Sequence, residues 1–349
     1  MAAPAPTTMD DLKAVITPEL LQLMVTNHLG HPRTSPLNYY AFITSMFTGG
    51  PAVDPALLHS KVWPALLAIS RFPGAPASLT PSLLAETFLP PPEDPTFPDQ
   101  ALGLILLLDQ GPRTFCKASG DAPTDVRYTD GFFAHIALPL ARWLLLDEAQ
   151  GGGLSEPSRP NSWARWESRG VTPDYYVLVR FMFGAVLVHA EEASARAQAR
   201  AYTEAARRWV EERYGVTDPF RDAGNPLRQE LMENDLYGFP RMVTAMVKGE
   251  LPDKKGLEEG KVNEDGKPWM GVAQGFFFLA LLFDVHLPLL EGFGRYPYRN
   301  GAMGRVHTPE EVAWMAGQDM FKELPDELRA RLREDVEAGK WTPLGGEPS

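Results

Sequence analysis

The stretch Phe293–Arg305 carries the residue types that point most directly to chemistry. Within thirteen residues it holds three arginines (Arg295, Arg299 and Arg305) and Asn300, separated by glycines and a proline. Arginine binds carboxylate, phosphate or a developing negative charge through a rigid planar fork, and glycine lets backbone approach a ligand closely. The stretch could therefore hold an anion or stabilise an oxyanion. The alternative is a buried loop whose arginines cap helix ends or pair with acidic residues.

Asp109 and Gln110 form a second candidate, because they follow an apolar run that starts at Leu102. A buried carboxylate without a partner is costly, so Asp109 should be paired. Arg113 is close enough in sequence to be that partner. The pair could be structural, functional or both.

The segment His189-Ala-Glu191-Glu192 lies where a long helical run changes from apolar to polar. Two glutamates beside a histidine could tune its proton affinity or bind a cation, or the group could be an ordinary boundary of the core. The pair of histidines four residues apart that binds zinc on helices is absent, so no metal site is expected. His286, in another apolar run, is a second candidate base.

The polar half of this run carries basic residues that could follow the phosphates of a nucleic acid. They are Arg196, Arg200, Arg207 and Arg208. The whole chain has a net charge of −12, from 33 lysines and arginines against 45 acidic residues. That excess argues against a DNA-binding protein and leaves room only for a local basic track.

Helices must position all of these residues, because apolar residues recur at helical spacing and no segment alternates with period two. We expect an all-α array of antiparallel helices with little or no β-sheet. Two of the expected helices begin at Thr17-Pro18 and at Thr172-Pro173, and the second of these continues to Tyr214. The others span Leu37–Phe47, Pro55–Ile69, Thr80–Phe88, Asp99–Gln110 (stopped by Gly111-Pro112), Thr129–Leu146, Trp269–Gly292, Thr308–Gly317 and Asp326–Gly339.

A single helical domain, 1–349, is expected. Residues 1–8 and 343–349 are predicted to be disordered tails, and 147–171 and 248–268 to be long loops or insertions. Cys116 is the only cysteine, which excludes an intrachain disulfide. The apolar runs are shorter than the ~20 residues that a membrane span needs, and no signal-peptide pattern is present. A soluble, cytoplasmic protein without a membrane partner is therefore expected.

Three segments together resemble a known family, the domain of unknown function 924. They are Leu106–Arg113, Val188–Glu192 with Gln198, and Phe293–Arg305 with Thr308–Glu311, and His286 falls where that family carries a histidine. The resemblance implies a helical, tetratricopeptide-like fold without a readable repeat. The chain departs from the family pattern at Gly111 (usually aromatic), Thr114 (asparagine), Ala190 (serine) and Tyr298 (histidine).

The length of the chain and these departures are more similar to a fungal branch related to arginine-containing cyclodipeptide synthases. That resemblance implies an enzyme that joins arginine to a second amino acid in a diketopiperazine. Its substrates would be arginyl-tRNA and a second aminoacyl-tRNA. An aminoacyl ester is already activated, so no cofactor is expected, and the chain has no phosphate-binding glycine motif.

Such a reaction needs an acidic pocket for the guanidinium, a base for the attacking amine and donors for the oxyanion. Asp109, Glu191 and Glu192 could form the pocket, and His189 or His286 could be the base. Oxyanion donors, or contacts to tRNA phosphates, could come from Arg295, Arg299 and Asn300, with Gln110, Arg113 and Arg305 as further substrate-binding residues. Cys116 is the candidate for a covalent step.

Two other classes of function remain open. One is a non-enzymatic, helical-repeat-like binding module that takes an anionic ligand through the Phe293–Arg305 loop. The other is a hydrolase of a small ester. Convergence of the three segments in one cleft would favour an enzyme, and dispersal would favour a binding module.

Overall fold

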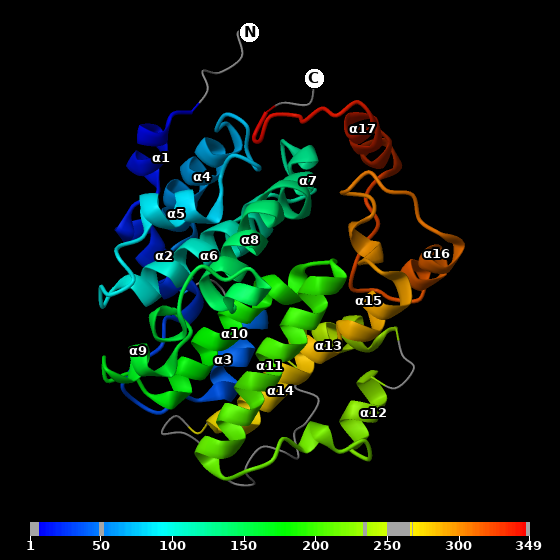
Figure 1. Ribbon diagram of the computed structural model, residues 1–349. Coiled ribbons are helices and arrows are strands. Elements are labelled where there is room, and N and C mark those ends of the chain that lie inside the picture. The colour runs from blue at the N-terminus through cyan, green and yellow to red at the C-terminus, as the bar shows by residue number, and fades with distance from the viewer. Residues whose placement is uncertain (1–6, 49–51, 233–235, 250–265, 267, 347–349) are drawn as a thin grey trace.

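The computed structural model describes residues 7–48, 52–232, 236–249, 266 and 268–346 (Figure 1). Within these ranges the fold is all-α and has no β-strand, which confirms the predicted class. The helices are α1 (Met9–Val15), α2 (Pro18–Leu29), α3 (Tyr39–Thr48), α4 (Pro55–Ser70), α5 (Pro81–Phe88), α6 (Phe97–Phe115), α7 (Val126–Tyr128), α8 (Ala134–Leu145), α9 (Trp163–Glu167), α10 (Pro173–His189), α11 (Ala193–Tyr214), α12 (Pro226–Met232), α13 (Gly238–Val247), α14 (Val272–Asp284), α15 (Leu287–Phe293), α16 (Pro309–Ala316) and α17 (Asp326–Glu337).

Several helices begin where a threonine precedes a proline. In α2, α5, α10 and α16 the threonine hydroxyl accepts the N–H of the residue three positions later, and proline occupies the first helical position. Proline has no N–H to leave unpaired there and its fixed φ suits a helix. At α16, Glu311 also accepts the N–H of Thr308, which completes a capping box.

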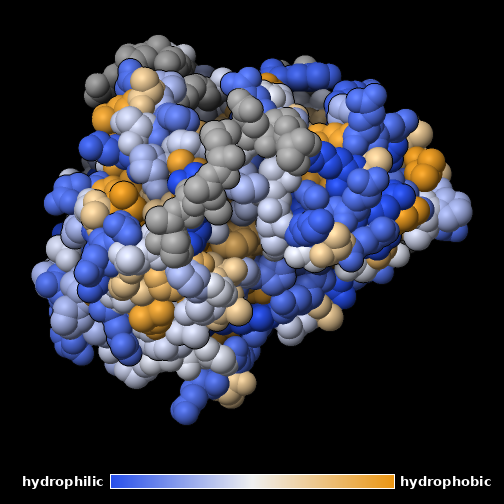
Figure 2. All heavy atoms as spheres, turned by 90° about the horizontal axis from the view of Figure 1, so that it is seen from above, coloured by the Kyte–Doolittle hydropathy of each residue, from blue (hydrophilic) through white to orange (hydrophobic). Residues whose placement is uncertain are grey.

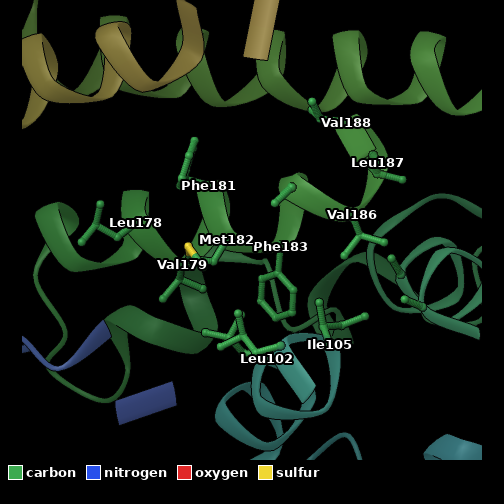
Figure 3. Close-up of a cluster of buried hydrophobic side chains, with 14 of the residues drawn as sticks. Leu102, Ile105, Leu178, Val179, Phe181, Met182, Phe183, Val186, Leu187 and Val188 are labelled. Carbon is green, nitrogen blue, oxygen red and sulfur yellow. The ribbon is translucent and has the colours of Figure 1, made fainter. Parts of the chain in front are cut away.

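Helix α6 is the centre of the fold, and α2, α4, α8 and α10 pack around it. Figure 3 shows Val179 and Phe183 of α10 directed toward Leu102 and Ile105 of α6. On another side, α2 crosses α6 at Gly103, where a Cβ atom would lie 2.3 Å from a backbone oxygen of α2. Only glycine permits that approach. A helix surrounded by others must be apolar on every face, as its sequence indicates.

The prediction that α6 stops at Gly111-Pro112 is wrong, because the helix continues to Phe115. Proline inside a helix removes one backbone hydrogen bond and strains the preceding turn. Here the turn is supported from outside, because Gly111 packs against Val62 and Leu66 of α4. The continuation keeps Arg113 on the helix, one turn beyond Asp109.

The long run from Thr172 to Tyr214 is two helices rather than one. Helix α10 ends at His189 and α11 begins at Ala193, with an extended backbone at the residues between them. The two helices form an antiparallel hairpin (Figure 1), since Arg180 donates to the carbonyl of Tyr202. The turn contains neither glycine nor proline, so the sequence carries no local signal for it. Its glutamates are held by arginines from distant parts of the chain.

The apolar run Trp269–Gly292 is also divided, into α14 and α15, at Val285-His286. The combined stretch Val272–Phe293 has the length and apolar character of a membrane span, but 72% of its most apolar window is buried inside the protein. Such burial is typical of a core helix in a soluble protein. On the face seen in Figure 2, hydrophilic residues predominate and hydrophobic residues form small separate groups.

The connection 147–171 is packed against the helices rather than open. It contains the short helix α9, and Trp166 within it is fully buried and donates to the carbonyl of Pro160. At the start of the connection, Asp147 pairs with Arg159 at 2.5 Å. Of the other predicted loop, 248–268, all but four residues lie outside the described ranges.

The tails are shorter than predicted. Thr8 caps α1, and Thr7 is buried with its N–H bonded to Arg71. At the other end Leu344 is buried, and the N–H of Gly345 donates to the carboxylate of Asp125. The expectation of disorder therefore does not hold for residues 7–8 and 343–346. Residues 1–6 and 347–349 lie outside the described ranges.

Candidate active site

A cavity of about 250 Å³ lies where the hairpin turn after α10 meets α6, α8 and the 294–305 loop. The apolar part of its lining includes Ala134, Leu138, Pro139, Val186 and Met303. The rest of the lining, here called the polar wall, carries charged and polar groups, chiefly Asp109, Arg113, Asp130, His189 and Arg299. An apolar pocket with a few convergent polar groups is the usual form of a small-molecule site.

Asp109 and His189 form the central pair of the polar wall. The ring Nδ1 of His189 lies 3.0 Å from both carboxylate oxygens of Asp109. An ionised carboxylate only accepts hydrogen bonds, so Nδ1 carries the proton and Nε2 carries the lone pair. Within the described residues Nε2 has no hydrogen-bond partner. This orientation of a histidine by a carboxylate is that of a general base.

The surroundings lower the pKa of both Asp109 and His189. Burial raises the pKa of Asp109, but His189, Arg113 and Gln110 outweigh it and hold the pKa below its usual range. Burial lowers the pKa of His189, and the charge of Arg113 lowers it further, despite the opposing effect of Asp109. At neutral pH the pair is therefore a carboxylate beside an uncharged imidazole, which is the form that can accept a proton.

Arg113, Asp130 and Arg299 form a charge network behind this pair. Arg113 contacts Asp109 at 3.4 Å and Asp130 at 3.3 Å, and Arg299 contacts the other oxygen of Asp130 at 3.3 Å. Arg299 also donates to the carbonyl of His189 at 2.7 Å and lies over the ring of Tyr296. The two guanidinium groups lower the pKa of Asp130 although burial raises it. The network fixes two cations at the cavity wall.

Glu191 and Glu192 both line the cavity but differ in their partners. Glu191 receives two hydrogen bonds from Arg305, at 2.6 and 3.1 Å, and one from the backbone N–H of Tyr296. Glu192 pairs with Arg142 at 2.8 Å, and 56% of its side chain is exposed. Both glutamates therefore pair with an arginine of this chain, but Glu192 is the more exposed of the two.

The remaining polar residues of the 293–305 loop point away from the cavity. The Nε and Nη2 groups of Arg295 donate to the two carboxylate oxygens of Glu311, at 2.6 and 2.7 Å. Asn300 is fully buried and donates to the same carboxylate. Together with Arg299 and Arg305, each loop arginine therefore meets a carboxylate of this chain. Arg295 and Asn300 are therefore not placed to contact a molecule in the cavity.

Glu311 is expected to stabilise the fold without serving the cavity. Replacing Glu311 by Gln keeps the capping box but removes the charge that faces Arg295, so the free energy of unfolding should fall by about 1–3 kcal/mol. Urea denaturation measures this change. Glu310→Gln, on the exposed side of the same turn, is the control and should have little effect. Equal stability of the two variants would contradict the structural assignment of Arg295.

His286 and Cys116 lie outside this cavity. His286 is buried, its Nδ1 donates to the carbonyl of Leu282, and its ring packs on Phe239. Burial, together with the nearby His189, lowers the pKa of His286 to about 3. Burial raises the pKa of the Cys116 thiol to about 12, which leaves almost no thiolate. Neither side chain is placed to react with a molecule in the cavity.

The four arginines of α11 do not form one exposed track. Arg207 is buried and its guanidinium binds Asp218 and Asp284. Arg196 donates to the carbonyl of Leu290, while Arg200 and Arg208 are exposed and face glutamates. Of the four, Arg200 and Arg208 are the ones that remain exposed to solvent.

Asp130 is the main site residue that the sequence analysis missed. It lies in a wide π-turn, Thr129–Phe133, at the start of α8. Such turns inside helices often occur at functional sites because they redirect one side chain. The polar Asp130 followed by Gly131 in an otherwise apolar helical run is a signal that could have revealed it. His135 and Met303 also line the cavity and were not singled out.

The structure thus brings together Asp109, Arg113, His189, Glu191, Glu192 and Arg299. Gln110 lies directly behind them and donates to Asp109 at 2.6 Å. In the part of the chain that the structure describes, no three His, Cys, Asp or Glu side chains are arranged to hold a metal ion. The polar wall can orient one neutral base and present two fixed cations.

The segments that line the cavity lie within a region that matches a known protein family. A family model described as "Bacterial protein of unknown function (DUF924)" matches residues 92–319. This range includes α6, α8, the α10–α11 hairpin and the 294–305 loop. No curated protein and no solved structure matches the chain.

Proposed function

The chain belongs to the DUF924 family, and on that premise we propose that it is an aminoacyl transferase that forms arginine-containing cyclic dipeptides from aminoacyl-tRNAs. The observation that carries the proposal is the neutral His189, oriented by Asp109, with its free Nε2 in a cavity that also holds Arg113 and Arg299. Aminoacyl transfer needs a base for an amine and fixed positive charge for the tetrahedral intermediate.

In the first step, Nε2 of His189 takes a proton from the α-amine of one aminoacyl group as that amine attacks the ester carbonyl of the other. Arg113 and Arg299 stabilise the negative charge on the carbonyl oxygen. The ester bond then breaks, the ribose hydroxyl of one tRNA leaves with the proton from His189, and a dipeptidyl-tRNA remains. In the second step the free amine of the dipeptidyl-tRNA attacks its own ester, His189 passes the amine proton to the leaving ribose oxygen, and the ring closes as the second tRNA is released.

Both steps are direct attacks by an amine, because the described cavity lining offers no serine, threonine or cysteine for an acyl-enzyme. The esters are already activated, so the proposal requires no nucleotide or other cofactor. It places the protein in the cytoplasm, where charged tRNAs are used. The tRNA bodies would lie outside the cavity, with the exposed Arg200 and Arg208 as candidate phosphate contacts.

Glu192 is the carboxylate we assign to the guanidinium of the arginyl substrate, because it is more exposed than Glu191 and accepts one hydrogen bond from Arg142, whereas Glu191 accepts two from Arg305. Glu192→Gln should raise the KM for arginyl-tRNA roughly 5–30-fold, corresponding to about 1–2 kcal/mol for a charged hydrogen bond. Asp147→Asn removes another exposed carboxylate paired with arginine, and it should leave the KM unchanged. A KM that responds equally to both changes would contradict the assignment.

The ionisation of His189 can be measured without substrate. Nuclear magnetic resonance titration of its ring should give a midpoint below 6.5, the usual value, because burial and Arg113 lower its pKa. The ring is then neutral at pH 7 and becomes charged only as the pH falls. In Asp109→Asn the pKa should fall further, because the carboxylate that favours the charged ring is lost. A midpoint well above neutral pH would mean that the ring is mostly charged at pH 7, and it would contradict the assignment of His189 as the base.

The decisive experiment is product analysis by mass spectrometry. The purified protein is incubated with arginyl-tRNA and a mixture of other aminoacyl-tRNAs, with and without prior ribonuclease treatment. Cyclic dipeptides that contain arginine and disappear after ribonuclease are the expected result. Product that persists after ribonuclease, or product without arginine, would overturn the proposal.

A second candidate, hydrolysis of a small activated ester, is favoured by the size of the cavity. About 250 Å³ suits one aminoacyl group better than two, and His189 could activate water as readily as an amine. The same experiment separates the two functions. Release of free arginine from arginyl-tRNA without any cyclic product would identify a hydrolase.

A further inference from the structure

The C-terminal segment, residues 340–346, forms a strap that returns from α17 to the site half of the molecule. In Figure 1 it runs from α17 across the top of the structure, above α7. Its far end is anchored, because Leu344 is buried and Gly345 lies against Trp63 of α4. The strap therefore spans the segment between α6 and α8 that contains Asp130.

Three residues of that segment form hydrogen bonds with the strap. Asp125 accepts the N–H of Gly345 at 3.0 and 3.1 Å. Arg127 donates to the carbonyl of Lys340 at 2.5 Å, and the hydroxyl of Tyr128 donates to the carbonyl of Thr342 at 2.9 Å. Together these contacts tie both ends and the middle of the strap to residues 125–128, directly before the π-turn.

Trp341 adds the packing contact. Its ring lies 3.8 Å from the guanidinium carbon of Arg127 and packs against Tyr128. A Cβ atom on Gly131 would lie 3.2 Å from this ring and 3.4 Å from the sulfur of Met303, so the π-turn is enclosed between Trp341 and the cavity wall. Asp130, the residue before Gly131, meets Arg113 and Arg299 in that wall.

We propose that Trp341 and the strap are positioning elements for the candidate site: they hold the π-turn so that Asp130 stays between Arg113 and Arg299. A π-turn has weaker backbone hydrogen bonding than an α-helix and needs support from its surroundings. Asp130 in turn keeps the two guanidinium groups at the cavity wall. The catalytic meaning of this role rests on the function proposed above, but the placement of Asp130 can be tested without any substrate.

The test compares Trp341→Ala with Trp341→Phe, since Trp341 lies partly exposed and its replacement leaves the core intact. Hydrogen exchange of the amides in 126–133 is expected to become roughly tenfold faster in Trp341→Ala. In the same variant the pKa of His189, measured by nuclear magnetic resonance, should fall, because Asp130 no longer offsets Arg113 and Arg299. Trp341→Phe keeps an aromatic ring over Arg127, so its exchange rates and its His189 pKa should stay close to those of the unaltered protein.

Two further variants separate positioning from general stability. Val247→Ala removes a half-exposed apolar side chain of α13, and it should change neither the exchange rates of 126–133 nor the His189 pKa. Tyr128→Phe removes only the hydrogen bond to the strap and should shift both values in the direction of Trp341→Ala. If Trp341→Ala lowers the melting temperature but leaves the His189 pKa and the exchange of 126–133 unchanged, the strap is merely structural and the inference is overturned.

Product formation is measured on the same variants as a separate arm. A slower reaction in Trp341→Ala with recovery in Trp341→Phe would support the role in catalysis. If the unaltered protein forms no cyclic dipeptide, the proposed function fails. The His189 titration and the hydrogen exchange would still decide whether the strap positions Asp130.

Discussion

His189→Asn is expected to reduce the rate of cyclic dipeptide formation by about 10²–10⁴-fold, the usual contribution of a positioned general base. Asparagine can keep a hydrogen bond to Asp109 but has no basic nitrogen to place in the cavity. The melting temperature should therefore change little. Single-turnover kinetics with saturating aminoacyl-tRNA measures the effect on the chemical step rather than on binding.

His59→Asn is the control for this substitution. His59 is exposed on α4 and stacks on Trp63, away from the cavity, and its replacement should leave the rate unaltered. A rate for His189→Asn within threefold of the unaltered protein would remove His189 from the mechanism. Because His286 is buried beneath Phe239, the base would then have to come from the substrate or from His135.

Arg299→Met is expected to lower the free energy of unfolding by about 3–5 kcal/mol, as happens when one member of a buried ion pair is removed. Arg299 is 6% exposed, and its loss leaves the carboxylate of Asp130 with only Arg113. It also leaves the carbonyl of His189 without its 2.7 Å donor. Guanidinium denaturation, followed by circular dichroism, measures the change.

The double variant Arg299→Met/Asp130→Asn tests the cause. If the loss comes from an uncompensated carboxylate, the second change should recover part of it, and the interaction energy should exceed about 1 kcal/mol. Arg208→Met is the matched control, because Arg208 pairs with Glu204 on the exposed side of α11. Its effect should stay below about 1 kcal/mol. Equal losses for the two arginines would contradict the buried network.

Local signals in the sequence account for most of the fold. Threonine followed by proline marks the start of α2, α5, α10 and α16, because the hydroxyl satisfies a free N–H and proline needs none. The break between α10 and α11 has no such signal. The turn at Ala190–Glu192 is held by Arg142 and Arg305, and α6 passes Pro112 because α4 supports it. Contacts across long stretches of sequence decide those points.

Part of the candidate site could also be predicted from the sequence. Polar residues at the ends of apolar runs, Asp109 and His189, do meet, because burial obliges each to find a partner. The density of arginines in the 293–305 loop did not show which of them a carboxylate of the same chain would occupy. Arg295 is bound by Glu311 through the capping box of the next helix, a pairing that becomes evident only from the fold.

The contact between Arg299 and the carbonyl of His189 joins residues 110 positions apart. At 5–20 residues per second, a ribosome needs roughly 5–20 s to synthesise the intervening chain. During that time a nascent chain has α6 and α10 but lacks the cation that completes the cavity wall. On the proposed function, the protein would compete with the ribosome for aminoacyl-tRNA. Its late assembly would keep every growing copy inactive until almost the whole chain has been made.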